Sequence, residues 1–143
     1  MYKRQLKWWL VGSNTEPALQ VYSGDAWQTS SYESQECWHW GGKVTANNYG
    51  NVAGFSMGRN SDGANRNIIQ GEVQMFNMHN TSYRKMMAAH TYFAIGSAFG
   101  QDKPYSESIG GWNGGNGAIT GLRWKCLQGN NFTDGKWILY GYN

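Results

Sequence analysis

The sequence contains little proline, little cysteine and little charge. Among its 143 residues are 2 Pro and 2 Cys, and charged residues make up 15% of the chain. One pair of cysteines cannot be the framework of a disulfide-rich fold. We expect Cys37 and Cys126 to be two buried thiols, because a protein that folds in the cytosol keeps its thiols reduced. A bond between adjacent strands is the alternative.

The chain also lacks a long apolar run and a dense basic region. Its first twelve residues combine a basic start with an apolar run that is too short for a signal peptide. No stretch approaches the roughly 20 apolar residues of a membrane-spanning helix. The formal charge is only +3, with one basic cluster at Lys3, Arg4 and Lys7. A nucleic-acid-binding surface needs a denser basic face. We therefore expect folding in the cytoplasm, no membrane insertion and no nucleic-acid partner.

Catalytic and metal-binding motifs are missing as well. His39, His79 and His90 are far apart, without the spacing that places two metal ligands together. No carboxylates show the paired arrangement that a glycosidase requires. The glycine-rich stretch at residues 110–117 lacks the Lys-Ser/Thr ending of a phosphate-binding loop, and we expect it to be a flexible loop. The sequence predicts no enzyme activity, no metal and no cofactor.

Glycine and aromatic residues are abundant, with 20 Gly, 8 Trp and 9 Tyr. This composition fits short strands joined by tight turns, and the length fits one domain over residues 1–143. Period-two alternation and turn residues predict strands, with residues 59–67 as a polar loop. The predicted strands cover residues 4–11, 18–22, 33–40, 52–57, 68–78 and most of 83–99, although residues 85–90 also contain good helix formers. The prediction is all-β: a single antiparallel, jelly-roll-like β-sandwich of about eight or nine strands.

The last quarter of the chain predicts a closing hairpin. Residues 118–127 alternate between two faces, and residues 137–141 do the same. The loop between them is rich in Gly and Asn and holds one apolar residue, Phe132, which can fold back onto the core. Alternating segments bounded by Gly and Asn are the usual signal of paired strands.

The same stretch, "AITGLRW…GNNFTDGKWILYGY", resembles the C-terminal signature of a β-sandwich domain in tailed-bacteriophage virion and tail-fibre proteins. The family has an Ile-Thr-x-Ile/Leu strand, a Gly-Asn-Phe-x-x-Gly turn and a final Leu-Tyr-Gly. The matching residues are Ile119, Thr120, Leu122, Gly129, Asn130, Phe132, Gly135, Leu139, Tyr140 and Gly141. Here Asn131 is inserted before the Phe of the turn. Residues 18–21 and 69–77 are similar to earlier strands of the family.

The resemblance implies a non-enzymatic virion structural protein on the particle surface, decorating or cementing the capsid or attached to the tail. It implies location in the virion, assembled in the host cytoplasm. The expected partners are other capsid or tail proteins and further copies of the chain, including a trimer. One alternative is a tail-fibre adhesin that binds host glycan, and a second is a free carbohydrate-binding, lectin-like module. The chain starts almost directly at its first strand without a stalk, which favours decoration over adhesion.

Aromatic residues are the candidates for binding. Trp8 and Trp9 are consecutive, so in a strand one must face away from the core. Because Leu6, Trp8 and Leu10 share one face, we expect Trp9 to face outward. Trp38 and Trp40 share a face and are either core residues or a stacking surface. The candidate interface or ligand-binding residues are Trp9, Trp38, Trp40, Trp112 and Asn113.

Overall fold

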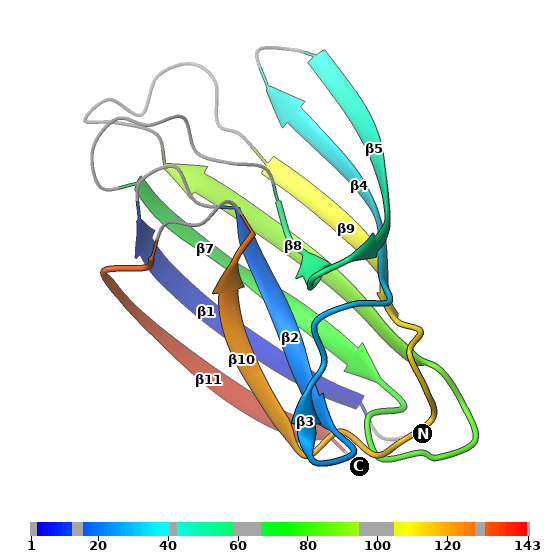
Figure 1. Cartoon of the computed structure of the whole chain (residues 1–143). Helices are drawn as coiled ribbons and strands as arrows, with labels where there is room; N and C mark the ends of the chain where they lie inside the picture. Colours follow the sequence, from blue (N-terminus) through cyan, green and yellow to red (C-terminus); the bar gives the residue numbers. More distant parts are fainter. Residues whose placement is uncertain are drawn as a thin grey trace.

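The computed structural model describes residues 3–12, 16–40, 43–58, 67–94, 105–127 and 131–142. Over these residues the secondary structure consists of eleven strands, which form two antiparallel sheets. Figure 1 shows the sheets packed face to face, with the smaller one against β1, β7 and β8 of the larger. The prediction of an all-β sandwich is confirmed, and the strand number exceeds the eight or nine predicted.

The larger sheet has seven strands and runs the length of the molecule. In spatial order they are β11 (Asp134–Tyr142), β1 (Lys3–Gly12), β7 (Asn67–Phe76), β8 (Lys85–Ala94), β9 (Tyr105–Trp112), β4 (Tyr32–Trp40) and β5 (Lys43–Val52). The smaller sheet consists of β10 (Gly121–Cys126), β2 (Pro17–Ser23) and β3 (Ala26–Trp27), with β6 (Phe55–Ser56) also paired to β2.

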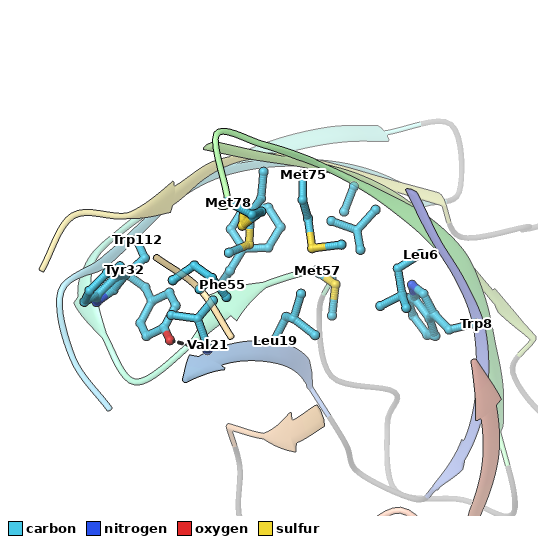
Figure 2. Close-up of a cluster of buried hydrophobic side chains, with 14 of the residues drawn as sticks. Leu6, Trp8, Leu19, Val21, Tyr32, Phe55, Met57, Met75, Met78 and Trp112 are labelled. Carbon is cyan, nitrogen blue, oxygen red and sulfur yellow. Dashed lines mark hydrogen bonds between the residues drawn. The ribbon is translucent and has the colours of Figure 1, made fainter. Parts of the chain in front are cut away.

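The core lies between β2 and the inner face of the large sheet. Alternation along β1 buries Leu6, Trp8 and Leu10 and leaves Lys7 and Trp9 exposed, as the sequence predicted. Figure 2 shows the large sheet curving around the buried cluster, with Leu6 and Trp8 at one end and Trp112 at the other. The central strands of the large sheet therefore have one face in the core and one face outside it, whereas the edge strands β5 and β11 have no buried residue among those described.

Tyr32 joins the two sheets by hydrogen bonds at the Trp112 end of the core. Its hydroxyl accepts from the backbone N–H of Val21 at 2.8 Å and donates to the carbonyl oxygen of Gln28 at 3.1 Å. The first of these bonds is drawn in Figure 2. The side chain is fully buried, so both bonds satisfy groups that water cannot reach.

The closing segments are strands, but the predicted hairpin is wrong. β10 pairs with β2 in the small sheet, whereas β11 pairs with β1 in the large sheet. Alternation shows which face of a strand is apolar but does not show which strand lies beside it. β10 instead faces β1 across the core, where Trp124 and Trp8 have ring centroids 4.7 Å apart. Phe132 does pack against the core, as expected.

Three strands were not predicted: the two-residue β3, and the longer β5 and β9. β5 is polar and rich in Asn, and no strand was predicted over most of it. β9 includes residues 110–112, which were predicted to be part of a flexible loop. Glycine is required there because a Cβ on Gly110 or Gly111 would collide with a backbone carbonyl oxygen, that of Glu33 or Lys85 respectively. The predicted strand at residues 52–57 is reduced to the two residues of β6.

The ambiguous segment at residues 83–99 is a strand where the structure describes it, as β8. Its residues after 94 lie outside the described part of the chain. The predicted polar loop at residues 59–67 also lies outside the described part, except for its last residue, Asn67, which begins β7.

Candidate binding face

The outer face of the large sheet, opposite the core, carries aromatic and charged side chains in ordered rows. In an antiparallel sheet, residues that are direct partners point to the same side. Trp9 is opposite Gln70, Gln70 is opposite Tyr92, and Tyr92 is opposite Tyr105, which is opposite His39. These residues form one row across five neighbouring strands, which we call the aromatic row.

The rings of the aromatic row are in contact over β8, β9 and β4. The ring centroids of Tyr92 and Tyr105 are 5.2 Å apart, and those of Tyr105 and His39 are 5.6 Å apart. His90 approaches Tyr105 edge-on at 6.1 Å. Trp9 and Tyr92 are 37% and 51% exposed, so water covers large parts of both rings. The row thus presents ring surface to any molecule that approaches this face.

A second row, of ionisable side chains, runs beside the first. Lys7, Glu72, His90 and Glu107 are successive partners on β1, β7, β8 and β9. The Glu72 carboxylate accepts a hydrogen bond of 2.7 Å from the side-chain amide of Gln5. The opposite charges of Lys7 and Glu72 on facing strands attract each other modestly, by about 0.2–1 kcal/mol. These groups therefore support the sheet while remaining available to a ligand.

Tyr105 connects the two rows. Its hydroxyl donates a hydrogen bond to the Glu107 carboxylate. Burial, together with the negative charge of Glu107, raises the pKa of Tyr105 above its usual range. The hydroxyl is therefore neutral over the physiological range and serves as a hydrogen-bond donor that orients the carboxylate.

Two adjacent hollows open on this face. One, of about 550 Å³, lies over β11, β1, β7 and β8, with Trp9, Glu72 and Tyr92 in its lining. The other, of about 500 Å³, lies over β8, β9, β4 and β5 and shares His90 with the first. Both volumes are in the range of small-ligand sites or of pockets that accept a partner's side chain. Donors, acceptors and ring surfaces in such hollows suit non-covalent binding.

The outer face is also unusually apolar for a surface. Seven large apolar side chains exposed by at least a third lie on it: Trp9, Val44, Met86, Tyr92, Ile109, Ile138 and Tyr140. Single exposed apolar residues are normal, whereas a collection on one face marks an interaction surface.

Of the residues predicted to bind, the structure places only Trp9 in the aromatic row. Trp38 is half-buried on the inner face of β4. Trp40 ends β4, and its side chain lies outside the described part of the structure. Trp112 is 3% exposed in the core, so its prediction as a surface residue is wrong. Asn113 is half-buried, and its side-chain amide donates to the Glu33 carboxylate at 3.2 Å.

The sequence did not predict Tyr92, Tyr105, His39 and His90 as a cluster. Tyr92, His90 and His39 are outward residues of strands that were predicted, so their facing was readable from the sequence. What joins them is the register between β8, β9 and β4, and that register depends on tertiary pairing. The predicted loop in place of the end of β9 also concealed the strand that carries Tyr105.

The described residues contain no group of three or more His, Cys, Asp or Glu side chains able to hold a metal ion. Cys37 and Cys126 are unbonded and half-buried rather than fully buried. The Cys37 Sγ lies 4.0 Å from His39 Nε2 on the outer face. In the part of the chain that is described, no helix has the length and hydropathy to cross a membrane.

No family model, curated protein or solved structure matches this chain. Function is therefore inferred from the outer face and from the resemblance of the closing segment.

Proposed function

We propose that this chain is a non-enzymatic structural protein of a tailed-bacteriophage particle, exposed on its surface. It attaches to a neighbouring virion subunit through the outer face of the large sheet. The observation that supports attachment most strongly is the set of seven exposed large apolar side chains on that face. The phage assignment is supported by the resemblance of the closing segment.

The area around Trp9 has the composition of a protein interface. Aromatic residues are enriched at the centre of such interfaces, with charged and polar groups around them. Trp9 is bordered by Tyr92 and Ile138, with Lys7 and Glu72 beside them at the 550 Å³ hollow. A partner's apolar side chain could fill this hollow, while Lys7 and Glu72 stay at the rim. Trp9 is the residue whose truncation should cost the most binding free energy.

The test compares two variants that both keep the fold. Trp9→Ala removes the proposed anchor, whereas Val44→Ala removes an exposed side chain on the same face, five strand spacings or about 24 Å away. Binding is measured to phage particles that lack this chain. Central aromatic anchors commonly cost about 2 kcal/mol or more when truncated, so Trp9→Ala should weaken binding at least tenfold. Val44→Ala should bind like the natural chain. Equal binding by all three proteins would refute attachment through Trp9.

A second candidate is a host-glycan adhesin, and the aromatic row favours it. Flat rings such as Tyr92 and Tyr105 can stack on sugar rings, and Gln70 and Glu107 nearby offer amide and carboxylate groups to hydroxyls. A glycan array tests this function directly. Specific binding of one sugar by the natural chain, lost in both Trp9→Ala and Tyr92→Ala, would replace attachment to virion subunits by adhesion.

A free carbohydrate-binding module would show the same glycan binding. It differs from an adhesin because it would be absent from phage particles purified by density gradient. Mass spectrometry of such particles separates the two, and detection of this chain in them is also what the virion assignment requires.

A further inference from the structure

The strand β11 forms one edge of the large sheet, and its free side is apolar. Within the described residues its only strand partner is β1. Four consecutive large apolar residues, Trp137, Ile138, Leu139 and Tyr140, are 50%, 46%, 36% and 40% exposed. Alternation sends two of them to each face, so both sides of the edge are apolar. Such an edge offers unpaired backbone groups and apolar side chains to another strand.

The opposite edge of the same sheet is protected. β5 carries polar residues, including Asn47 and Asn48, and its pairing with β4 is interrupted by a register shift between Tyr32 and Ser34. Polar side chains and irregularities are the means by which edge strands avoid pairing with other chains. In β11 the charged residues, Asp134 and Lys136, lie at one end. Its pairing with β1 is continuous over nine residue pairs, and its middle is apolar. The contrast indicates that β11 is covered in the working protein.

We propose that β11 pairs with β11 of a second copy of this chain, antiparallel, around a two-fold axis at Ile138. The two seven-stranded sheets then become one continuous sheet across the dimer. A two-fold interface requires a surface that is complementary to itself, and a strand that pairs antiparallel with its own copy meets that condition. This pairing rests on β11 alone and does not depend on what the outer face binds.

The register follows from the length and facing of β11. A two-fold axis normal to the sheet pairs residues of the same face, and an axis at Ile138 pairs all nine residues of Asp134–Tyr142. Ile138 then faces its own copy, and Trp137 faces Leu139 of the second copy. An axis at Lys136 would place two ammonium groups opposite each other, which is unfavourable. With the axis at Ile138 the two Lys136 residues are four positions apart along the strands, about 13 Å.

Pairing would also cover an opening between the two sheets. Trp137 and Leu139, on the inner face of β11, line an apolar hollow of about 320 Å³ together with Met75, Ile119 and Leu122. The second copy brings its own Trp137 and Leu139 to the mouth of this hollow. Side chains that are only partly buried in one chain therefore become covered in the pair, and burial of apolar surface stabilises the pair by roughly 25 cal/mol per Å².

The experiment exploits the axis at Ile138, where each substitution meets its own copy. The mass of the full-length chain is measured by sedimentation equilibrium for the natural sequence, Ile138→Glu, Ile138→Lys and a one-to-one mixture of the two variants. The natural chain should have twice the monomer mass. Each variant alone places like charges opposite each other and should raise the dimer dissociation constant at least about tenfold. The mixture places Glu opposite Lys and should restore the dimer.

A matched control substitutes the other edge. Val44→Glu adds the same charge on β5 and should leave the dimer unchanged, and so should Trp9→Ala on the outer face. A natural chain that stays monomeric up to its solubility limit would overturn the proposal. So would dimers that persist in both Ile138 variants, or a mixture that does not recover. If the natural chain pairs through β11 only with a strand of a different protein, the proposed self-pairing is also wrong.

Discussion

Trp8 and Trp9 are neighbours in the sequence but have opposite surroundings. Trp8 is 4% exposed and its ring packs against Trp124, with centroids 4.7 Å apart. Trp9 is 37% exposed and lies in the aromatic row on the outer face. Strand alternation alone separates the two indoles, so one side chain supports the core and the next is available for binding.

This difference predicts opposite effects on stability. Trp8→Ala should lower the free energy of unfolding by about 3–5 kcal/mol, because it removes a large buried ring and leaves a cavity. That loss is enough to unfold a marginally stable domain. Trp9→Ala should change the free energy of unfolding by less than about 1 kcal/mol. Urea denaturation of the two variants measures both effects, and a larger loss for Trp9→Ala would invert the assigned facing of β1.

Tyr32 predicts a loss of stability at alkaline pH. Burial raises its pKa from 10.0 to about 12. Between these values the unfolded chain releases the proton and the folded chain keeps it, so the stability contributed below pH 10 is lost as pH rises towards 12. Tyr32→Phe should be less stable at neutral pH, because Val21 and Gln28 lose a buried hydrogen-bond partner.

The measurement is the denaturation midpoint at a series of pH values from neutral to about pH 12. The natural chain should lose more stability over the alkaline range than Tyr32→Phe does. Burial and the nearby Glu36 carboxylate also raise the pKa of Tyr49 to about 12. Because Tyr49 is present in both proteins, it accounts for part of the loss that remains in Tyr32→Phe. Parallel curves for the two proteins would show that Tyr32 does not titrate in this way.

Among the elements, β9 depends most clearly on glycine. A Cβ on Gly111 would collide with the carbonyl oxygen of Lys85 on β8, whereas a Cβ on Gly50 in β5 would meet nothing within 4 Å. Gly111→Ala should therefore cost about 1–3 kcal/mol or more through strain. Gly50→Ala should leave the melting temperature nearly unchanged. Equal melting temperatures for the two variants would show that β8 and β9 can separate without cost.

How well each strand could be predicted depends on how regularly its apolar and polar residues alternate and on where its glycines lie. β1 and β7 alternate apolar and polar residues strongly, and their ranges were predicted to within a few residues. β5 has Asn and Gly where an alternating strand would have apolar residues, and no strand was predicted there. β9 has Gly110 and Gly111 near its end, and these residues were predicted to lie in a flexible loop. Gly110 and Gly111 are explained by the closeness of neighbouring backbones, which sequence patterns do not contain.

The candidate site was predictable only in part, for a related reason. The outward facing of Trp9 follows from local alternation and was predicted. The grouping of Tyr92, Tyr105 and His39 follows from pairing among β8, β9 and β4, which are distant in the chain. Trp112 was predicted to bind because its glycine neighbours indicated a flexible loop. In the structure it ends β9, and its indole is buried in the core.

At the scale of the whole molecule, the two faces of the large sheet have separate roles. The inner face holds the apolar cluster that stabilises the sandwich, and the small sheet covers it (Figure 1). The outer face contributes little to that core and carries the aromatic and charged rows. Substitutions on the outer face should therefore alter binding far more than folding, which makes the proposed function accessible to experiment.

The most direct test of the central claim is a cryo-EM map of the phage particle with this chain fitted into it. We predict density for the domain on the particle surface, with the outer face of the large sheet, around Trp9, against a neighbouring subunit. A map in which that face points to solvent, or particles that contain no density for this chain, would contradict the proposed attachment.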